Sequence, residues 1–365
     1  MKITDIRTSE FSVPLRTPFK TALRTVTAIH DVLVTVTTDD GRHGYGEAPP
    51  TAPITGETIG SIRCAVEEFI RPALLGREIE DLDGTMHVLH TAILHNTSAK
   101  AAVDMAIYDL YAQELGVPLY RLLGGSKTEL ETDLTISVNS PEEMAADSLT
   151  AVGRGFRILK IKVGLQPELD LARIQAVRKA VGPKIAIRVD ANQGWSPAQA
   201  VRIIRGMEDA GLTLDLVEQP VKAADLDGMA YVRRNVSTSI LADESVFSSV
   251  DAMAVIQKGA ADFLNIKLMK TGGIYGALQI CSIAESCGVT CMVGCMLESS
   301  LAVSAAAHLA AGKRIITRAD LDGPGLCSAN PYLGGPQFLE NRIIMNENPG
   351  LGILPKWVDE TEKMQ

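Results

Sequence analysis

Lysines and carboxylates recur at regular intervals in this 365-residue chain, each near the end of a short apolar segment. Lys162, Asp190, Glu218, Asp243 and Lys267 follow one another at intervals of 28, 28, 25 and 24 residues. Such an interval is the length of one strand, one helix and two turns, which is typical of parallel βα units. In a βα barrel the functional groups lie at the carboxyl ends of the strands. The spacing therefore indicates an active site at the mouth of a barrel.

The three acids predict a metal site at this mouth. Adjacent strands lie about 4.8 Å apart, so Asp190, Glu218 and Asp243 should converge within bonding range of one ion. Without a cation, carboxylates that close would repel one another and take up protons. Oxygen-only ligands with room for water and substrate favour Mg²⁺, with Mn²⁺ as the alternative. Separate structural roles in helix caps or arginine pairs are the competing interpretation, which three acids in register disfavour.

The lysines predict proton transfer. Lys160 and Lys162 are two residues apart on one strand, so they share a face, although solvated strand-end lysines are also common. Lys267 ends the sixth strand, diametrically opposite the second strand of an eight-stranded barrel, and Lys270 is its competitor. A nearby cation and a metal would lower a lysine's pKa toward neutrality, as a general base requires. One lysine on each face of a metal-stabilised enediolate would invert an α-carbon.

The length of the chain predicts a second domain beside the barrel. We expect antiparallel strands in residues 1–50, with a turn at Pro14, a loop at residues 18–25 and a hairpin around residues 39–42. Helices are expected at residues 57–75, 80–95 and 98–115. Barrel strands are expected at residues 132–138, 158–163, 185–190, 215–218, 239–243, 262–267, 289–293 and 315–320. The predicted domains are an N-terminal α+β capping domain (residues 1–125, completed by the tail, about 326–365) and a catalytic barrel (residues 126–325).

Composition restricts the class of protein. The net charge is −9 and no basic tract is present, which disfavours nucleic acid and membrane surfaces as partners. No apolar run reaches membrane-spanning length, and the N-terminus has no signal-peptide pattern. The six cysteines include no CxxC pair, which favours reduced thiols. We therefore expect a cytoplasmic enzyme that acts on a small molecule.

The motifs around these residues resemble those of the enolase superfamily, in its muconate-lactonising subgroup, and within it the dipeptide epimerases. They are Lys160-Ile-Lys162, Asp190-Ala-Asn192, Val217-Glu218-Gln219-Pro220, Ala242-Asp243-Glu244-Ser245 and Asn265-Ile-Lys267. Enolase-type sites in general combine a lysine or histidine base with Mg²⁺. The resemblance implies an α/β fold, a modified TIM barrel of (β/α)7β type under an N-terminal α+β capping domain.

The resemblance also implies a site for a substrate ammonium. Asp320-Leu321-Asp322 is similar to the DxD pair by which dipeptide epimerases hold that group. Alternate strand residues would place both carboxylates on one face of the barrel mouth. A helix cap or a turn before Gly323 is the alternative. Lys160, by the same resemblance, would help to hold the metal-bound substrate carboxylate.

Four further residues match substrate contacts of the resembled family. Arg24 is similar to the arginine that meets a substrate glutamate side chain, whereas an exposed arginine is commonly only solvated. Thr135, Cys295 and Leu297 lie at or near the first and seventh barrel strands, where ordinary barrel lining is the alternative. The positions that Cys295 and Leu297 match carry different residues in different members of the family.

The implied function is Mg²⁺-dependent epimerisation of a dipeptide at its C-terminal residue, above all L-Ala-D/L-Glu, by proton transfer between Lys162 and Lys267. We also expect a substrate derived from murein peptide, and a homo-oligomer. Other dipeptides or N-acylamino acids are alternatives within the superfamily. Muconate cycloisomerisation is disfavoured because the acid pair requires a cationic substrate group. A Schiff-base lyase using either lysine, or an inactive binding protein, would leave the three acids unexplained.

Overall fold

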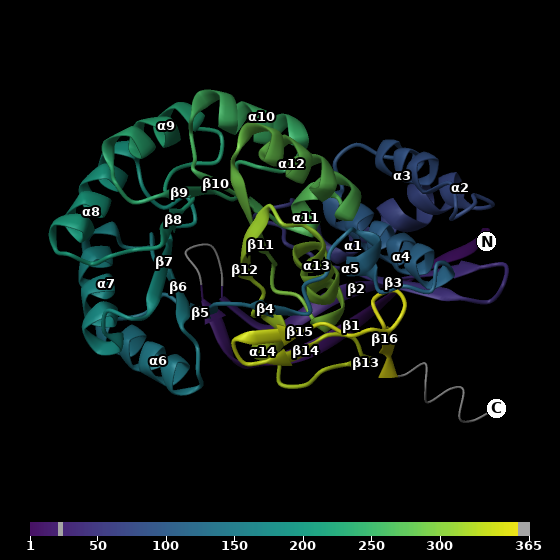
Figure 1. Ribbon diagram of the computed structural model, residues 1–365, viewed down its shortest axis with the longest axis horizontal. Helices are drawn as coiled ribbons and strands as arrows, with labels where there is room; N and C mark the ends of the chain where they lie inside the picture. Colours follow the sequence, from purple (N-terminus) through teal and green to yellow (C-terminus); the bar gives the residue numbers. More distant parts are fainter. Residues whose placement is uncertain (21–24, 357–365) are drawn as a thin grey trace.

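The computed structural model describes residues 1–20 and 25–356. Its centre is a nearly closed barrel of eight parallel strands in the order β12-β11-β10-β9-β8-β7-β6-β5 (Figure 1). The strands are β5 (Leu134–Ile136), β6 (Ile158–Lys162), β7 (Ala186–Asp190), β8 (Leu216–Glu218), β9 (Ile240–Ala242), β10 (Phe263–Ile266), β11 (Thr290–Gly294) and β12 (Ile316–Asp320). The predicted barrel is confirmed, and every strand lies within two residues of its predicted bounds.

Helices lie outside the strands of the barrel (Figure 1). They are α6 (Pro141–Gly153), α7 (Pro167–Val181), α8 (Pro197–Asp209), α9 (Leu226–Asn235), α10 (Ser249–Lys258), α11 (Leu268–Thr271), α12 (Ile274–Cys287), α13 (Ser300–Gly312) and α14 (Gly323–Leu326). Local sequence fixes where some of them begin. Ser140 and Ser196 form capping boxes at α6 and α8, and each is followed by a proline at the first helical position.

The N-terminal part combines an antiparallel sheet with helices. The sheet has the order β1-β2-β3, from β1 (Ile3–Lys20), β2 (Thr25–Thr38) and β3 (His43–Ala48). The helices are α1 (Ile59–Cys64), the π-helix η1 (Ala65–Ile70), α2 (Arg71–Leu74), α3 (Leu82–Thr91), α4 (Thr97–Glu114) and α5 (Leu119–Leu122). This is the α+β arrangement predicted from the sequence.

The N-terminal sheet differs from the prediction in two places. The predicted turn at Pro14 is wrong, because Pro14 lies within β1 opposite Ala28. β1 is an edge strand, which tolerates proline because its open side requires no N–H donor. The prediction of a loop at residues 18–25 is wrong at both ends of that range. β1 extends to Lys20 and β2 begins at Thr25, and these two residues are paired. A register irregularity between Pro14 and Phe19 interrupts the alternation that would have revealed the strand.

The C-terminal segment returns to the N-terminal part. Its strands are β13 (Tyr332–Gly334), β14 (Gln337–Leu339), β15 (Arg342–Ile344) and β16 (Ile353–Pro355), and β15 pairs with β4 (Glu129–Glu131). Ser328 donates its N–H to the carbonyl of Pro14 at 2.9 Å, and Leu119 donates to the carbonyl of Gly350 at 2.9 Å. Within the described ranges, no helix is long and apolar enough to cross a membrane.

Two buried acids fix the N-terminal part to barrel helices. Glu47, in β3, accepts hydrogen bonds from the N–H of Ser299 at 2.7 Å and of Ala302 at 3.1 Å, at the start of α13. Asp104, in α4, accepts from the N–H of Ile274 at 2.6 Å, at the start of α12. Negative charge is favourable at a helix N-terminus, where backbone N–H groups lack helical partners. These contacts hold the N-terminal part against the barrel.

Close packing of β3 on α4 generates a stability prediction. A Cβ atom at Gly46 would lie 1.8 Å from the carbonyl oxygen of Ala102, so Gly46→Ala should force the two elements apart. Such overpacking typically costs about 1–3 kcal/mol of unfolding free energy, occasionally more. Gly60→Ala is the matched control, because a Cβ there meets nothing within 4 Å on an exposed helical residue. Urea unfolding followed by circular dichroism measures both variants, and equal stability of the two would contradict the packing.

Candidate active site

A cavity of about 660 Å³, including its open mouth, lies at the carboxyl ends of the barrel strands. Small-molecule sites typically measure roughly 300–1,000 Å³. All the predicted lysines and substrate contacts in the described chain line it, namely Thr135, Lys160, Lys162, Lys267, Cys295, Leu297, Asp320 and Asp322. Arg24 falls outside the described residues. The structure thus brings residues from five of the barrel strands or the loops that follow them, and from distant parts of the sequence, to one place.

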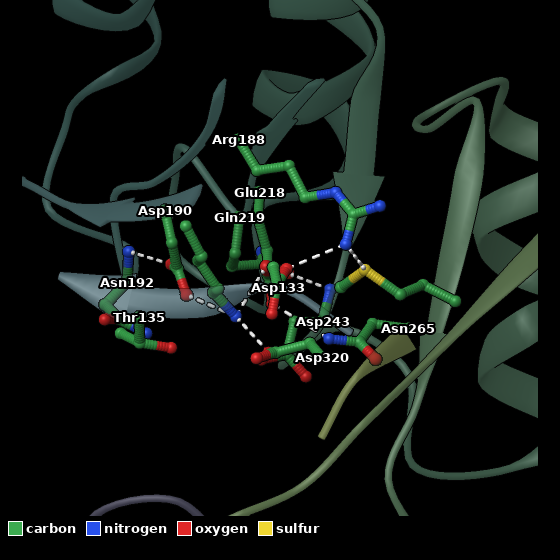
Figure 2. A network of polar contacts seen from close by, with 12 residues as sticks. Asp133, Thr135, Arg188, Asp190, Asn192, Glu218, Gln219, Asp243, Asn265 and Asp320 are labelled. Carbon is green, nitrogen blue, oxygen red and sulfur yellow. Dashed lines mark hydrogen bonds and ion pairs between the residues drawn. The ribbon is translucent and has the colours of Figure 1, made fainter. Parts of the chain in front are cut away.

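Two of the three predicted metal ligands share a lysine. Asp190 and Glu218 are register partners on β7 and β8, and Figure 2 shows them on neighbouring strands near Asp320. The ammonium nitrogen of Lys160 lies 3.1 Å from Asp190 Oδ2 and 2.8 Å from Glu218 Oε2. Lys162 Nζ lies 2.6 Å from the same Asp190 oxygen. Positive charge from β6 therefore balances the acids of β7 and β8.

The third acid, Asp243, is paired with two lysines from the other side of the barrel. Lys267 Nζ lies 2.7 Å from Asp243 Oδ2, and Lys270 Nζ lies 2.6 Å from Oδ1. Lys270 is completely buried and also donates to the backbone carbonyls of Asp243 and Asn265. Of these two lysines, Lys267 is the one that lines the cavity. Lys270 instead supports the acid and the end of β10.

The acids form a donor set that fits a hard divalent cation. In the described part of the chain, no three His, Cys, Asp or Glu side chains form a ready ligand cluster, because Asp190, Glu218 and Asp243 each turn oxygens toward lysines. Glu218 Oε2 and Asp243 Oδ1 nevertheless accept no well-formed hydrogen bond, although ammonium groups lie 2.8 and 2.6 Å away. Buried carboxylate oxygens with free lone pairs suit Mg²⁺ or Mn²⁺.

The electrostatics of Lys267 reflect its burial and the acids around it. Burial disfavours the charge of its ammonium, but the attraction of nearby carboxylates, Asp243 first, outweighs burial and raises the pKa of Lys267 above its usual value. The pKa of buried Lys160 is also raised, because Asp320, Glu218 and Asp190 surround it. The lowering toward neutrality is predicted for a site that holds a metal ion, and it stays a prediction.

The two aspartates of the DxD sequence lie in different electrostatic surroundings. Asp320 Oδ2 lies 2.7 Å from Lys160 Nζ. Burial disfavours the charge of Asp320, but the combined attraction of Lys160, Lys267 and Lys162 outweighs burial and lowers the pKa of Asp320 to about 2. Burial, and then the charge of Asp320, raise the pKa of Asp322 to about 6. Asp322 Oδ2 accepts a hydrogen bond from the N–H of Thr135 at 2.7 Å. It precedes α14 but makes no side-chain cap, so the helix-cap alternative is not supported.

Comparison with known families agrees with this geometry. Residues 143–358 match the family described as enolase C-terminal domain-like, and residues 3–124 match the N-terminal domain of mandelate racemases and muconate lactonizing enzymes. The chain belongs to the enolase superfamily. Both parts of the fold are therefore those of the superfamily that the motifs of Lys160, Asp190, Glu218, Asp243 and Lys267 indicated.

Several relatives in the enolase superfamily match this chain along almost its full length. The L-Ala-D/L-Glu epimerase of Clostridium acetobutylicum is 52% identical, over 97% of this chain and 99% of its own. A substrate-liganded structure of the L-Ala-D/L-Glu epimerase from Bacillus subtilis is 51% identical, with a TM-score of 0.96, and covers 97% and 99% of the two chains. The Enterococcus faecalis dipeptide epimerase, in complex with Mg and L-Leu-L-Tyr, is 41% identical, with a TM-score of 0.92 and the same coverage.

The cavity of this enolase-superfamily member has lining residues that sequence reasoning missed: Phe19, Pro53, Ile54, Asn192, Met296 and Leu326. Asn192 could have been found, because it lies two residues beyond Asp190 in a quoted motif. Phe19 and Ile54 come from the N-terminal part, and no local pattern indicates that they reach the barrel mouth. Their position follows from how β1 and the segment after β3 pack against the barrel.

The two partners of Asp243 generate a prediction about stability. Lys270→Met should lower the free energy of unfolding by about 1–3 kcal/mol, because the buried carbonyls of Asp243 and Asn265 would lose their donor. Lys267→Met should cost less, since no carbonyl loses a donor there. In each variant the remaining lysine still pairs with Asp243. Denaturant unfolding of both variants measures the difference, and a larger loss for Lys267→Met would contradict the supporting role of Lys270.

Proposed function

We propose that this chain is a dipeptide epimerase, an isomerase that inverts the α-carbon of the C-terminal residue, with L-Ala-D-Glu and L-Ala-L-Glu as its principal substrates. One observation carries the proposal: Lys162 on β6 and Lys267 after β10 line a single cavity from strands four positions apart in an eight-stranded barrel. Relatives that share half of its residues along the whole chain carry the same activity in their names.

The carboxylate end of the substrate would lie beside Lys160 and the three acids. Asp190, Glu218 and Asp243 are the proposed ligands of Mg²⁺, with Mn²⁺ as the alternative, and a relative crystallised with Mg and a dipeptide supports this choice. A bound divalent cation supplies positive charge that offsets the negative charge developing on the substrate carboxylate. The side-chain amide of Asn265 donates to Glu218 Oε1 at 2.9 Å and holds that acid in place.

Proton transfer is assigned to the two facing lysines. One lysine, as the neutral amine, takes the α-proton from one face, so that the C–H bond breaks and an N–H bond forms. The other, as an ammonium, returns a proton to the opposite face and leaves the carbon inverted. Phe19, Pro53 and Ile54 cover the cavity from the N-terminal part. By excluding water they would protect the reacting carbon from solvent and strengthen the electrostatic contacts around it.

The other end of the dipeptide is assigned to the acid pair. Asp320 and Asp322 would hold the substrate ammonium, and Thr135, Cys295 and Leu297 would contact the rest of the molecule. Arg24 remains the sequence-based candidate for a glutamate side chain. A cytoplasmic location, a homo-oligomer and a substrate derived from murein peptide likewise remain expectations.

Two alternatives differ in what the cavity supports. Other dipeptides are a second candidate for the substrate, because Phe19, Ile54 and Leu297 give the cavity an apolar wall. The structure of one relative also contains a hydrophobic dipeptide, L-Leu-L-Tyr. A Schiff-base lyase requires a neutral nucleophilic amine. That reaction would give Asp190, Glu218 and Asp243 no role, whereas the epimerase uses all three.

The proposed function predicts a metal-dependent change of configuration. With Mg²⁺, the protein should convert L-Ala-L-Glu into a mixture with L-Ala-D-Glu, measured by chiral chromatography after hydrolysis. EDTA should abolish the conversion and added Mg²⁺ should restore it. L-Leu-L-Tyr, assayed in parallel, tests the hydrophobic alternative. Turnover of L-Leu-L-Tyr alone would reassign the substrate, and full activity in EDTA would contradict the role of the three acids.

A further inference from the structure

The barrel has one seam that its backbone does not close. β5 and β12 stand at the two ends of the strand order, and in the described part of the chain they share no ladder hydrogen bonds. Side chains join them instead. Asp322 Oδ2 accepts from the N–H of Thr135 at 2.7 Å, and Thr132 Oγ1 accepts from the N–H of Leu321 at 2.8 Å. The residues proposed to receive the substrate ammonium therefore lie at the one strand boundary, among the described residues, that no backbone ladder closes.

Arg188 reaches this seam from inside the barrel. It lies on β7 opposite Lys160 and two residues before Asp190, and it is almost completely buried. One guanidinium nitrogen, Nη1, donates to Asp133 Oδ2 at 2.7 Å on the β5 side. The same nitrogen donates to the carbonyl of Ala319 at 3.0 Å on the β12 side. Figure 2 shows Arg188 pointing toward Asp133.

A second link through Arg188 reinforces the first. Its Nε donates to Asp215 Oδ2 at 3.0 Å, and Asp215 Oδ1 in turn accepts from Arg318 of β12 at 3.0 Å. The guanidinium group thus connects β7, the segment before β8, the segment before β5, and β12. Because arginine presents several donors in a rigid plane, it can satisfy these partners at once, which a lysine could not do.

We propose that Arg188 is a positioning residue that clamps the β5–β12 seam and so sets the spacing of Thr135, Asp320 and Asp322. Ala319 immediately precedes Asp320, and Asp133 lies two residues before Thr135, so the clamp acts directly below the ammonium site. The inference rests on the proposed function for what that site binds, but not for the clamp itself. Arg188 does not line the cavity described above and would act only through the strands that it joins.

The first test measures the seam without any substrate. In Arg188→Gln, amide hydrogen exchange followed by mass spectrometry should accelerate in peptides covering residues 132–138 and 316–324. Arg178→Gln is the matched control, because Arg178 donates to the carbonyls of Gly182, Ile185 and Thr213, at the other end of the barrel strands. That variant should leave exchange at the seam unchanged even if its melting temperature falls.

The second test measures the consequence for substrate. In Arg188→Gln, KM for L-Ala-L-Glu should rise by roughly tenfold, which is less than the hundredfold that a 1 Å misplacement of reacting groups can cost. kcat should change less, and KM for the N-acetylated dipeptide should barely move. Arg178→Gln should preserve the ratio of the two KM values. If Arg188 had a purely structural role, its replacement would raise KM for both substrates by the same factor.

A double variant keeps the inference testable if Arg188→Gln fails to fold. Arg188→Gln with Asp133→Asn leaves no uncompensated buried charge, yet it still removes the charged clamp, and it should give the same exchange and KM pattern. Normal exchange at the seam in a folded variant would overturn the clamp. Fast exchange with an unchanged KM ratio would overturn its link to the ammonium site. An inactive wild type would overturn the proposed function and leave the clamp to be decided by exchange alone.

Discussion

The structure depends on how it accommodates like charges buried side by side. Asp190 and Glu218 are register partners on adjacent parallel strands, and Asp243 follows the next strand. Carboxylates this close and this deeply buried cannot all stay ionised unless positive charge lies among them. The ammonium group of Lys160, on β6, contacts Asp190 and Glu218 directly, and it also contacts Asp320 on β12. The barrel mouth is therefore a balanced network of charges, and the geometry of one member fixes that of its neighbours.

This balance connects the architecture to the chemistry. Lys160, Lys162 and Lys267 pair with the acids and also line the cavity, so a proton transfer at one of them would alter the network. Lys267 is held as an ammonium by Asp243, 2.7 Å away, and must lose part of that attraction before it can accept a proton. Lys270, 2.6 Å from the other oxygen of Asp243, would keep that acid paired if Lys267 lost its charge. Lys270 thus supports the acid from a buried position, whereas Lys267 pairs with the same acid and lines the cavity.

Much of the site could be predicted from sequence because its residues obey a local rule. A functional side chain at each strand end, repeated with the length of one βα unit, is enough to place Lys162, Asp190, Glu218 and Lys267 at the barrel mouth, where the structure has them. Strand parity likewise placed Lys160 beside Lys162. Such features depend on neighbours along the chain, which a sequence displays directly.

The remaining features depend on contacts between distant segments. β1 continues through Pro14 because an edge strand tolerates proline. The sequence around Pro14 does not reveal that this strand lies at the edge of its sheet. Phe19 reaches the cavity only through the packing of the N-terminal sheet on the barrel. The raised pKa of Lys267 reflects its particular distance from Asp243. Arg188 has no neighbour in sequence that marks the seam, since Asp133 and Ala319 are separated from it by more than fifty residues in each direction.

The claim that two lysines act on opposite faces of one carbon is tested most directly by isotope exchange in single variants. Lys162→Ala and Lys267→Ala would each be incubated with Mg²⁺ in D2O, separately with L-Ala-L-Glu and L-Ala-D-Glu, and the glutamate α-proton followed by NMR. Each variant should exchange that proton in one isomer only, the two variants should have opposite preferences, and neither should form the other isomer. A single variant that exchanges both isomers, or that still epimerises, would contradict a site in which each lysine serves one face.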